Sequence, residues 1–388
     1  MGGPARLLAL LAVAAATHAQ GAVAAVSDRF VPADPAFVVA TVRQAQPDAK
    51  LLPLLEAWRA DRASASATVA LASAFIERAR VLREPAYFGR AEAALAPLAV
   101  RPGASATVRR LYALVLQYRH DFAGAEELLD AILREDAREE DARLLRASVR
   151  LVRGDFDGAR ADCAQLAAAG GTVAASGFAC FAEALAGGGH LDRALSMLGT
   201  LPMDSRTMEA SVCAYLLATR AELRERSDDN PGAIADYRAA LELAPRDDSI
   251  RAALADALSA SGRTAEARAV LTVDQPGVAL LVRSAALAEG PSRADLILRA
   301  DGLLALEAAR GDALHDREAA MLALAKGDPA RALSAARRNF EVQKELADIR
   351  VLARAARAAR DAQALSALRQ WLFETGYRDS VSAGIVGS

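Results

Sequence analysis

The sequence predicts an all-α protein, an α-solenoid of about eight or nine stacked helix pairs. Three observations support this prediction. The 388 residues are 53% hydrophobic but only 5% aromatic, and most of the apolar residues are Ala and Leu, which are strong helix formers. Apolar residues recur at steps of three and four in many segments, as they do on one face of a helix. A short motif also returns at nearly constant spacing along the chain.

The repeated motif opens a helix and contains an alanine that marks its phase. It is clearest in NPGAIADYRAALELAPRDD, residues 230–248, where the marker is Ala233. The equivalent residues are Ala125, Ala159, Ala194, Ala267 and Ala332, with weaker copies at Ala91 and Ala364. From Ala91 to Ala267, successive markers are 34, 34, 35, 39 and 34 residues apart. The interval from Ala267 to Ala332 is 65 residues, so we expect a degenerate unit near Ala300.

Each unit of this length is a helix pair that is too small to bury its own apolar face. Neighbouring units must stack to complete a core, so we expect a quasi-one-dimensional array in which each unit contacts its neighbours. The marker alanine is small because the two helices approach closely there, and a Leu would overpack the contact. Glycines such as Gly154 and Gly327 suit the tight turn that ends the first helix of a unit.

A period of 34 residues, with Gly or a polar residue shortly before the marker, resembles the tetratricopeptide repeat family. The resemblance extends over residues 67–375 and is strongest from Ala106 to Val270. It implies a right-handed superhelix whose first helices line a concave surface that binds a partner.

The first residues, 1–19, have the features of a signal peptide. Arg6 precedes an apolar core, Leu7–Ala16, and small residues suit cleavage before Gln20 or, alternatively, after Ala24. This core is too short to span a bilayer, and no later run approaches the required length. We therefore expect an exported bacterial protein, periplasmic or secreted, without an integral membrane span after cleavage. The alternative is an uncleaved N-terminal membrane helix.

The ends of the array need caps because a terminal unit has a neighbour on one side only. Residues 20–66 are expected to supply one or two capping helices, in which Leu55 and Trp58 cover the first packed face. Trp371 is expected to cover the other end. Residues 376–388 form a C-terminal tail, and we expect its end, residues 381–388, to be disordered.

The chain has three cysteines, two of which are placed to form a disulfide. Cys163 lies in the second helix of one unit and Cys180 in the first helix of the next, at similar distances from the turn near Gly170. In an antiparallel helix pair the two residues are nearly level, and an exported protein meets an oxidising compartment. We expect a Cys163–Cys180 disulfide. The alternatives are a Cys180–Cys213 bridge and buried free thiols.

The sequence contains no motif of a catalytic, metal or phosphate site. His120, His190 and His315 have no second ligand at metal-binding spacing, and no nucleophile or phosphate-loop signature occurs. The formal net charge is −2, with Arg spread along the chain rather than gathered on one face. We therefore expect no enzyme activity, no cofactor, no metal and no nucleic-acid partner.

The resemblance to tetratricopeptide repeats implies that polar residues of the first helices line the partner-binding groove. The residues at these positions are Arg110, Gln117, Tyr118, Asp141, Ser148, Glu183 and Asp256. The Lys and Asn residues with which some members of the family bind a C-terminal carboxylate are absent, since the lysines Lys50, Lys326 and Lys344 fall elsewhere. A receptor for chaperone tails is therefore disfavoured.

These observations predict a non-catalytic, exported scaffold that binds a protein or peptide partner in a concave groove. Two alternatives remain open at this point. One is an envelope protein that binds glycan or peptidoglycan, which would favour clustered aromatic residues in the groove. The other is a structural spacer without a specific ligand. The sequence leaves the identity of the partner and the oligomeric state open.

Overall fold

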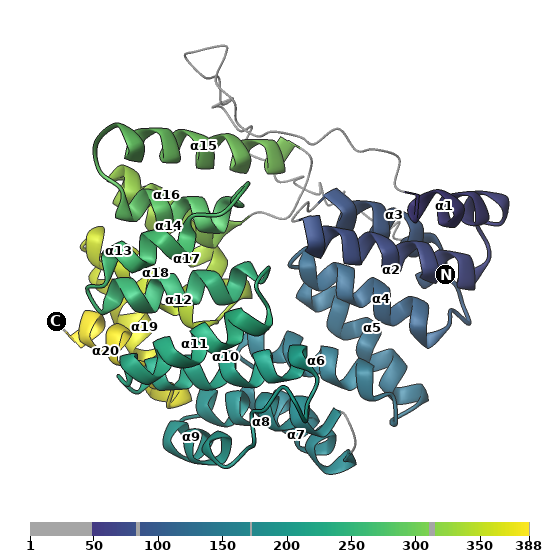
Figure 1. Cartoon of the computed structure of the whole chain (residues 1–388). Helices are drawn as coiled ribbons and strands as arrows, with labels where there is room; N and C mark the ends of the chain where they lie inside the picture. The colour runs from purple at the N-terminus through teal and green to yellow at the C-terminus, as the bar shows by residue number, and fades with distance from the viewer. Residues whose placement is uncertain (1–48, 83–85, 171–172, 310–314, 388) are drawn as a thin grey trace, which may run out of the picture.

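The computed structural model describes residues 49–82, 86–170, 173–309 and 315–387. Over these residues the chain forms twenty α-helices and no strand, which confirms the predicted all-α solenoid (Figure 1). The expected signal peptide and the N-terminal part of the capping segment, up to residue 48, lie outside the described residues.

The helices are arranged as nine successive pairs, each with a first and a second helix. The pairs are α2 (Ala65–Leu82) and α3 (Ala86–Ala99), α4 (Ala106–Tyr118) and α5 (Phe122–Glu135), α6 (Glu140–Arg153) and α7 (Phe156–Ala169), α8 (Val173–Gly187) and α9 (Leu191–Gly199), α10 (Ala210–Arg226) and α11 (Asn230–Leu243), α12 (Asp248–Ala260) and α13 (Thr264–Leu271), α14 (Val278–Leu287) and α15 (Gly290–Ala309), α16 (Asp316–Lys326) and α17 (Pro329–Val342), and α18 (Leu346–Ala358) and α19 (Ala362–Thr375). The helix α1 (Leu51–Ala60) precedes them and α20 (Ser380–Gly387) follows.

The marker alanines all lie in second helices and face the packed interior. Those from Ala91 to Ala332 are 0% exposed, and Ala364 is 6% exposed. Ala300, in α15, is also 0% exposed, so the degenerate unit lies where the long interval places it. Because the side chain of each marker is a single methyl group, the paired helices can approach closely at these points.

Second helices often begin with an aspartate cap, which occupies the small or polar position of the marker motif. Asp121, Asp155, Asp229 and Asp328 stand four residues before their markers, and each accepts a hydrogen bond from a backbone N–H of the first turn. A cap of this kind stabilises a helix by about 1 kcal/mol. It therefore fixes where the second helix of a unit starts.

Both ends of the array are covered. Trp58 and Leu55 of α1 pack, partly buried, against the first hydrophobic core. At the other end Trp371 makes an edge contact with Phe340, and the ring centroids are 5.2 Å apart. The prediction of a disordered end is wrong for residues 381–387, because they belong to α20.

The order of α20 has a clear physical cause. The carboxylate of Asp379 accepts hydrogen bonds from the backbone N–H and the hydroxyl of Ser382, which stabilises the first turn of the helix. Val386, on its last turn, is 4% exposed and belongs to the C-terminal hydrophobic core. The segment is short and rich in small residues, so its sequence alone resembled a loose terminus.

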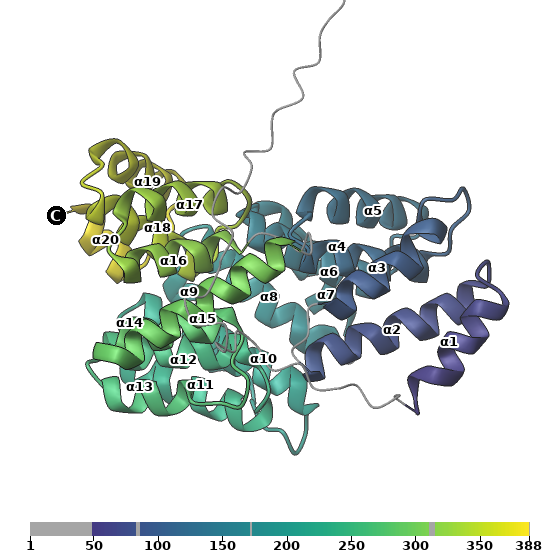
Figure 2. The same cartoon turned by 90° about the horizontal axis from the view of Figure 1, so that it is seen from above.

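The array also folds back on itself, which the expectation of contacts between neighbouring units did not include. The C-terminal helices lie beside the middle units in both views (Figures 1 and 2). Residues of the last two units and of the α19–α20 turn contact the C-terminal ends of α4, α6, α8 and α10. We call this contact the closure interface. Its members in the middle units are His120, Val152, Gly154, Gly189, Asp192, Glu225 and Arg226, and those in the C-terminal part are Gln343, Lys344, Arg350, Gly376, Tyr377 and Arg378. Asp379 lies beside them, bound to Arg350.

Helix ends explain why the closure interface is polar. The last carbonyls of a helix have no partner within the helix, and they attract donors and positive charge. The backbone N–H of Lys344 donates to the Val152 carbonyl at the end of α6, at 2.7 Å. The guanidinium of Arg226 donates to the carbonyls of Ala186 and Arg378, each at 2.9 Å, and stacks over the ring of Tyr377.

One turn at this interface favours glycine. Gly154 has φ 78°, in the left-handed region, and a Cβ atom there would lie 2.7 Å from Cδ of Lys344. A side chain at this position would therefore strain the backbone and displace Lys344. His120 occupies the corresponding turn one unit earlier and also has a positive φ, 60°. Its Nδ1 lies 3.1 Å from Oε1 of Gln343, so a polar contact to the C-terminal part accompanies the unusual conformation.

Candidate functional site

The first helices of four successive units line an open pocket of about 370 Å³. We call it the first-helix pocket. Its lining residues come from α4, α6, α8 and α10, and they are Arg110, Leu114, Asp141, Leu144, Leu145, Ser148, Ser176 and Tyr215. Residues three or four apart on one helix share a face, so Arg110 and Leu114 project together from α4, as Leu145 and Ser148 do from α6.

The pocket has an apolar wall and a polar edge. Leu114, Leu144 and Leu145 supply the apolar side chains, together with the ring of Tyr215. At the edge, Nη1 of Arg110 lies 3.2 Å from a carboxylate oxygen of Asp141. The pair is largely open to water, because the Asp141 side chain is 65% exposed. An exposed pair of this kind adds little stability, so both groups are free to reorient toward a ligand.

Two carboxyl groups lie next to the pocket, on α8 and α10. The hydroxyl of Tyr215, which lines the pocket, donates to Oε2 of Glu183 at 3.3 Å. Burial and the nearby Glu222 and Glu345 raise the pKa of Glu183 to about 8. Burial also raises the pKa of Glu222, to about 7, although Arg226 opposes the shift. Both side chains are only partly exposed, so the ionised forms are poorly solvated.

The structure brings together most of the groove residues that the sequence analysis named. Arg110, Asp141 and Ser148 line the pocket. Gln117 stands beside it, since its Nε2 donates to the Ser148 hydroxyl at 3.1 Å, and Glu183 is joined to it through Tyr215. These five residues therefore form one neighbourhood.

The other two residues lie in different surroundings. The ring of Tyr118 stacks on Phe88, with 4.1 Å between the centroids, and its hydroxyl accepts hydrogen bonds from Arg80. Asp256 forms an ion pair with Arg283, at 2.8 Å. Neither side chain lines the first-helix pocket.

Several pocket residues were not named by the sequence reasoning. They are Leu114, Leu144, Leu145, Ser176 and Tyr215, with Glu222 beside them. Positions three or four residues from a named polar residue on the same helix would have found the leucines. Tyr215 and Glu222 are seven positions apart on α10, so they lie two turns apart on one face of that helix. This spacing is visible in the sequence.

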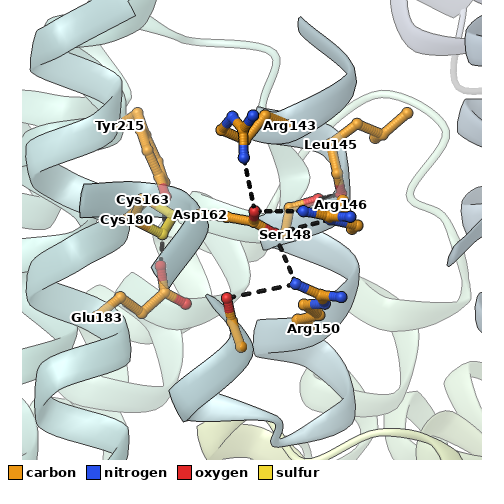
Figure 3. The surroundings of a disulfide bond; sticks show 11 residues. Arg143, Leu145, Arg146, Ser148, Arg150, Asp162, Cys163, Cys180, Glu183 and Tyr215 are labelled. Atoms are coloured by element: carbon orange, nitrogen blue, oxygen red, sulfur yellow. Dashed lines mark hydrogen bonds and ion pairs between the residues drawn. A yellow bond between two sulfur atoms is a disulfide. The ribbon is translucent and has the colours of Figure 1, made fainter. Parts of the chain in front are cut away.

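A disulfide ties the pocket wall to the helix behind it (Figure 3). Cys163 of α7 and Cys180 of α8 are bonded, with their Cα atoms 5.6 Å apart. Since Ser176 and Glu183 lie one turn on either side of Cys180, the bond restricts the helix that presents them. Cys213, the third cysteine, is a buried free thiol, and burial raises its pKa. The alternative Cys180–Cys213 pairing is therefore not formed in this structure.

An ion network holds α6 against α7 on the other side of the disulfide (Figure 3). Asp162 stands three residues after the marker of its unit, and its side chain is 2% exposed. It accepts hydrogen bonds from Arg143 at 3.2 Å, from Arg146 at 2.6 and 2.9 Å, and from Arg150 at 2.9 Å. All of its hydrogen-bonding capacity is used within the chain, so this network is structural.

The same arrangement recurs two units later. Asp236, three residues after Ala233, accepts hydrogen bonds from Arg220 and Arg224 of α10 at 2.6 to 2.7 Å. The repeated feature is an aspartate on a second helix that binds two arginines one turn apart on the first helix. It orients the first helices that carry the pocket residues.

Part of this array matches a known protein family. Residues 226–274 match the family model of the tetratricopeptide repeat. The matched residues run from the end of α10 through α13, which is one second helix and the complete pair that follows it. This part of the chain carries the tetratricopeptide repeat. The tetratricopeptide repeat fold suggests a scaffold for protein interaction, and the family is generally non-catalytic.

Two solved tetratricopeptide repeat proteins are similar to this chain. One, a thermophilic protein from Thermus thermophilus, is 22% identical, with 52% of this chain and 99% of that one covered and a TM-score of 0.38. The other, from Parabacteroides merdae, is 15% identical, with 73% and 98% covered and a TM-score of 0.39. The search of curated proteins gave no match.

Among the residues that the structure describes, no helix combines the length and apolar character that crossing a bilayer demands. Nor do three or more His, Cys, Asp or Glu side chains gather there in an arrangement suited to a metal ion.

Proposed function

We propose that this protein is a non-catalytic, exported scaffold that binds an extended peptide segment of a protein partner in the first-helix pocket. The observation that carries the proposal is the pocket itself, which four successive first helices form together. An apolar wall with polar groups at its edge is the usual composition of a ligand site in a protein. The pocket therefore suits one anchoring side chain and the backbone that flanks it.

The composition of the pocket favours a peptide over a glycan. Sugar rings are commonly bound on the faces of aromatic side chains, and Tyr215 is the single aromatic residue of the pocket lining. The two tryptophans, Trp58 and Trp371, pack against the cores at the two ends of the array. A spacer without a ligand, in turn, would not need an open hollow with an apolar wall.

The pocket can be tested with peptides selected from a random phage-displayed library against the full chain. We expect the selected peptides to lose about tenfold or more in affinity when Leu144 is replaced by Asp, because a charge then lies in the apolar wall. Leu52→Asp is the matched control, since Leu52 is 46% exposed on α1 and lies outside the pocket. Equal affinity of all selected peptides for both variants would show that the pocket is not the binding site.

Export is the second part of the proposal. It rests on the N-terminal signal-like sequence and is supported by the disulfide, a bond that persists in oxidising compartments. A chain expressed in a bacterium with its own N-terminus is expected to begin near Gln20 in the periplasmic fraction. Alkylation in denaturant should then modify one cysteine without reductant and all three after reduction. A cytoplasmic chain that keeps residues 1–19, or three modified cysteines without reductant, would contradict export.

A further inference from the structure

An acidic region lies next to the first-helix pocket, toward the C-terminal ends of α8 and α10. Glu183 touches the pocket through its hydrogen bond with Tyr215, and Glu222 lies two turns further along α10. Glu345, at the start of α18, faces both carboxyl groups from the opposite side of the closure interface. Three acidic side chains, from α8, from α10 and from the N-cap of α18, thus lie near enough to act on one another electrostatically.

The arginines around this region are bound to other groups. Arg226 donates to two backbone carbonyls and stacks on Tyr377. Arg350 pairs with Glu225 and Asp379, and Arg317 pairs with Asp348 and Glu345. In the parts of the chain that the structure describes, no side-chain cation forms an ion pair with Glu183 or Glu222. Neither carboxyl group is therefore paired directly with a cation among these residues, although Arg226 lies near both.

This arrangement lowers the stability of the protein without a ligand. The groups that face Glu183 are Tyr215, Glu222 and Arg226 of α10 and Glu345 of α18, and those that face Glu222 include Glu225 and Arg350. A carboxyl whose pKa is higher in the folded chain than in the unfolded chain holds its proton more tightly after folding. The contribution of this carboxyl group to the free energy of unfolding is then greatest below its ordinary pKa of 4.5. It decreases as the pH rises toward the raised pKa. Destabilising groups of this kind are retained typically at sites of function.

We propose that the partner segment places a large apolar side chain against Leu144 and Leu145 and an adjacent Lys or Arg side chain between Glu183 and Glu222. The inference rests on the proposed function and names the chemistry of the ligand for the same pocket. The cation supplies the positive charge that the chain itself does not place there. The apolar side chain fills the part of the pocket where no charge is present. The ligand is therefore a basic–apolar peptide segment rather than an acidic one.

The free protein gives the first test. Glu183→Gln is nearly isosteric and removes the ionised form, so we expect it to raise Tm at about pH 8 and to leave Tm unchanged at about pH 4. Glu127→Gln, an exposed residue of α5, is the matched control and should change Tm at neither pH. A lower Tm for Glu183→Gln at about pH 8 would show that Glu183 stabilises the fold, and it would overturn the inference.

The second test uses the peptides selected against the full chain. We expect them to share a large apolar residue next to Lys or Arg, and replacing that Lys or Arg by Gln should weaken binding by about tenfold or more. The Glu183→Gln and Glu222→Gln variants should each reduce the preference for the Lys peptide over the Gln peptide, and the double variant should bind the two nearly equally, whereas Glu127→Gln should keep the preference. Affinity for the Lys peptide should also decrease from about pH 8 to about pH 6, as the carboxyl groups become protonated.

The outcomes separate the two proposals. Peptides that depend on Leu144 but show no preference for a basic residue, or prefer an acidic one, would overturn the ligand chemistry and leave the pocket as the binding site. A selection in which no peptide depends on Leu144 would overturn the proposed function and the inference together.

Discussion

Asp162→Ala is expected to lower the free energy of unfolding by about 3–5 kcal/mol, which is the usual effect of removing one partner of a buried ion pair. The Asp162 carboxylate is 2% exposed and binds Arg143, Arg146 and Arg150. Its removal leaves buried or half-buried guanidinium groups without their shared counter-ion. Urea unfolding followed by circular dichroism measures the change.

The control for this experiment is on the same helix. Asp157→Ala removes an aspartate whose side chain is 84% exposed and whose ion pair with Arg160 is at the surface, so we expect a change below about 1 kcal/mol. Similar small changes for Asp162→Ala and Asp157→Ala would mean that the three arginines are satisfied without Asp162. The account of how α6 is held against α7 would then be wrong.

Arg350→Ala is expected to have an effect of similar size, about 3–5 kcal/mol, and also to change the shape of the molecule. Arg350 joins Glu225 of α10 to Asp379, the residue that caps α20. All three side chains are 7% exposed or less. Without the guanidinium, two buried carboxylates face each other across the closure interface, and their repulsion favours separation of the C-terminal helices from the middle units. Small-angle X-ray scattering should therefore show a larger radius of gyration.

Arg354→Ala provides the matched control for the closure interface. Arg354 lies one turn further along α18 and is exposed, so its replacement should change neither stability nor radius of gyration appreciably. Hydrogen exchange at Lys344, whose backbone N–H bonds to Val152, should be faster in Arg350→Ala than in Arg354→Ala. Unchanged exchange and an unchanged radius would show that closure does not depend on this ion pair.

Local features of the fold could be predicted from the sequence because they repeat. The marker alanines gave the phase of the units, since a position that must be small is small in each copy. The interval between Ala267 and Ala332 contained one more unit, and Ala300 lies there, fully buried.

The C-terminal end of the chain could be predicted less well. Residues 381–387 carry few large apolar side chains, and their order depends on Asp379 and Val386, whose roles emerge from tertiary contacts.

The closure interface could not be predicted because nothing in the spacing of a repeat describes contacts between distant units. Arg350 and Glu225 are 125 positions apart, and His120 and Gln343 are 223 positions apart.

The sequence analysis identified only some of the residues that line the pocket. Arg110, Asp141 and Ser148 were identified as polar residues of first helices, whereas the apolar residues between them were attributed to packing. Which of those leucines line the pocket depends on the relative orientation of four helices, and that orientation is set by networks such as the one around Asp162.

The return of the chain onto its own middle changes how the protein is expected to lose its structure. In an open array each unit is supported by its neighbours alone, so the outermost units can melt first and the transition spreads inward. Here the last units are attached to the ends of α6, α8 and α10, so they cannot separate without exposing groups that belong to the middle of the chain. Denaturation should consequently be more cooperative than in a linear array of the same length. Refolding should be slower, because contacts between distant parts of the sequence have to form before the structure is complete.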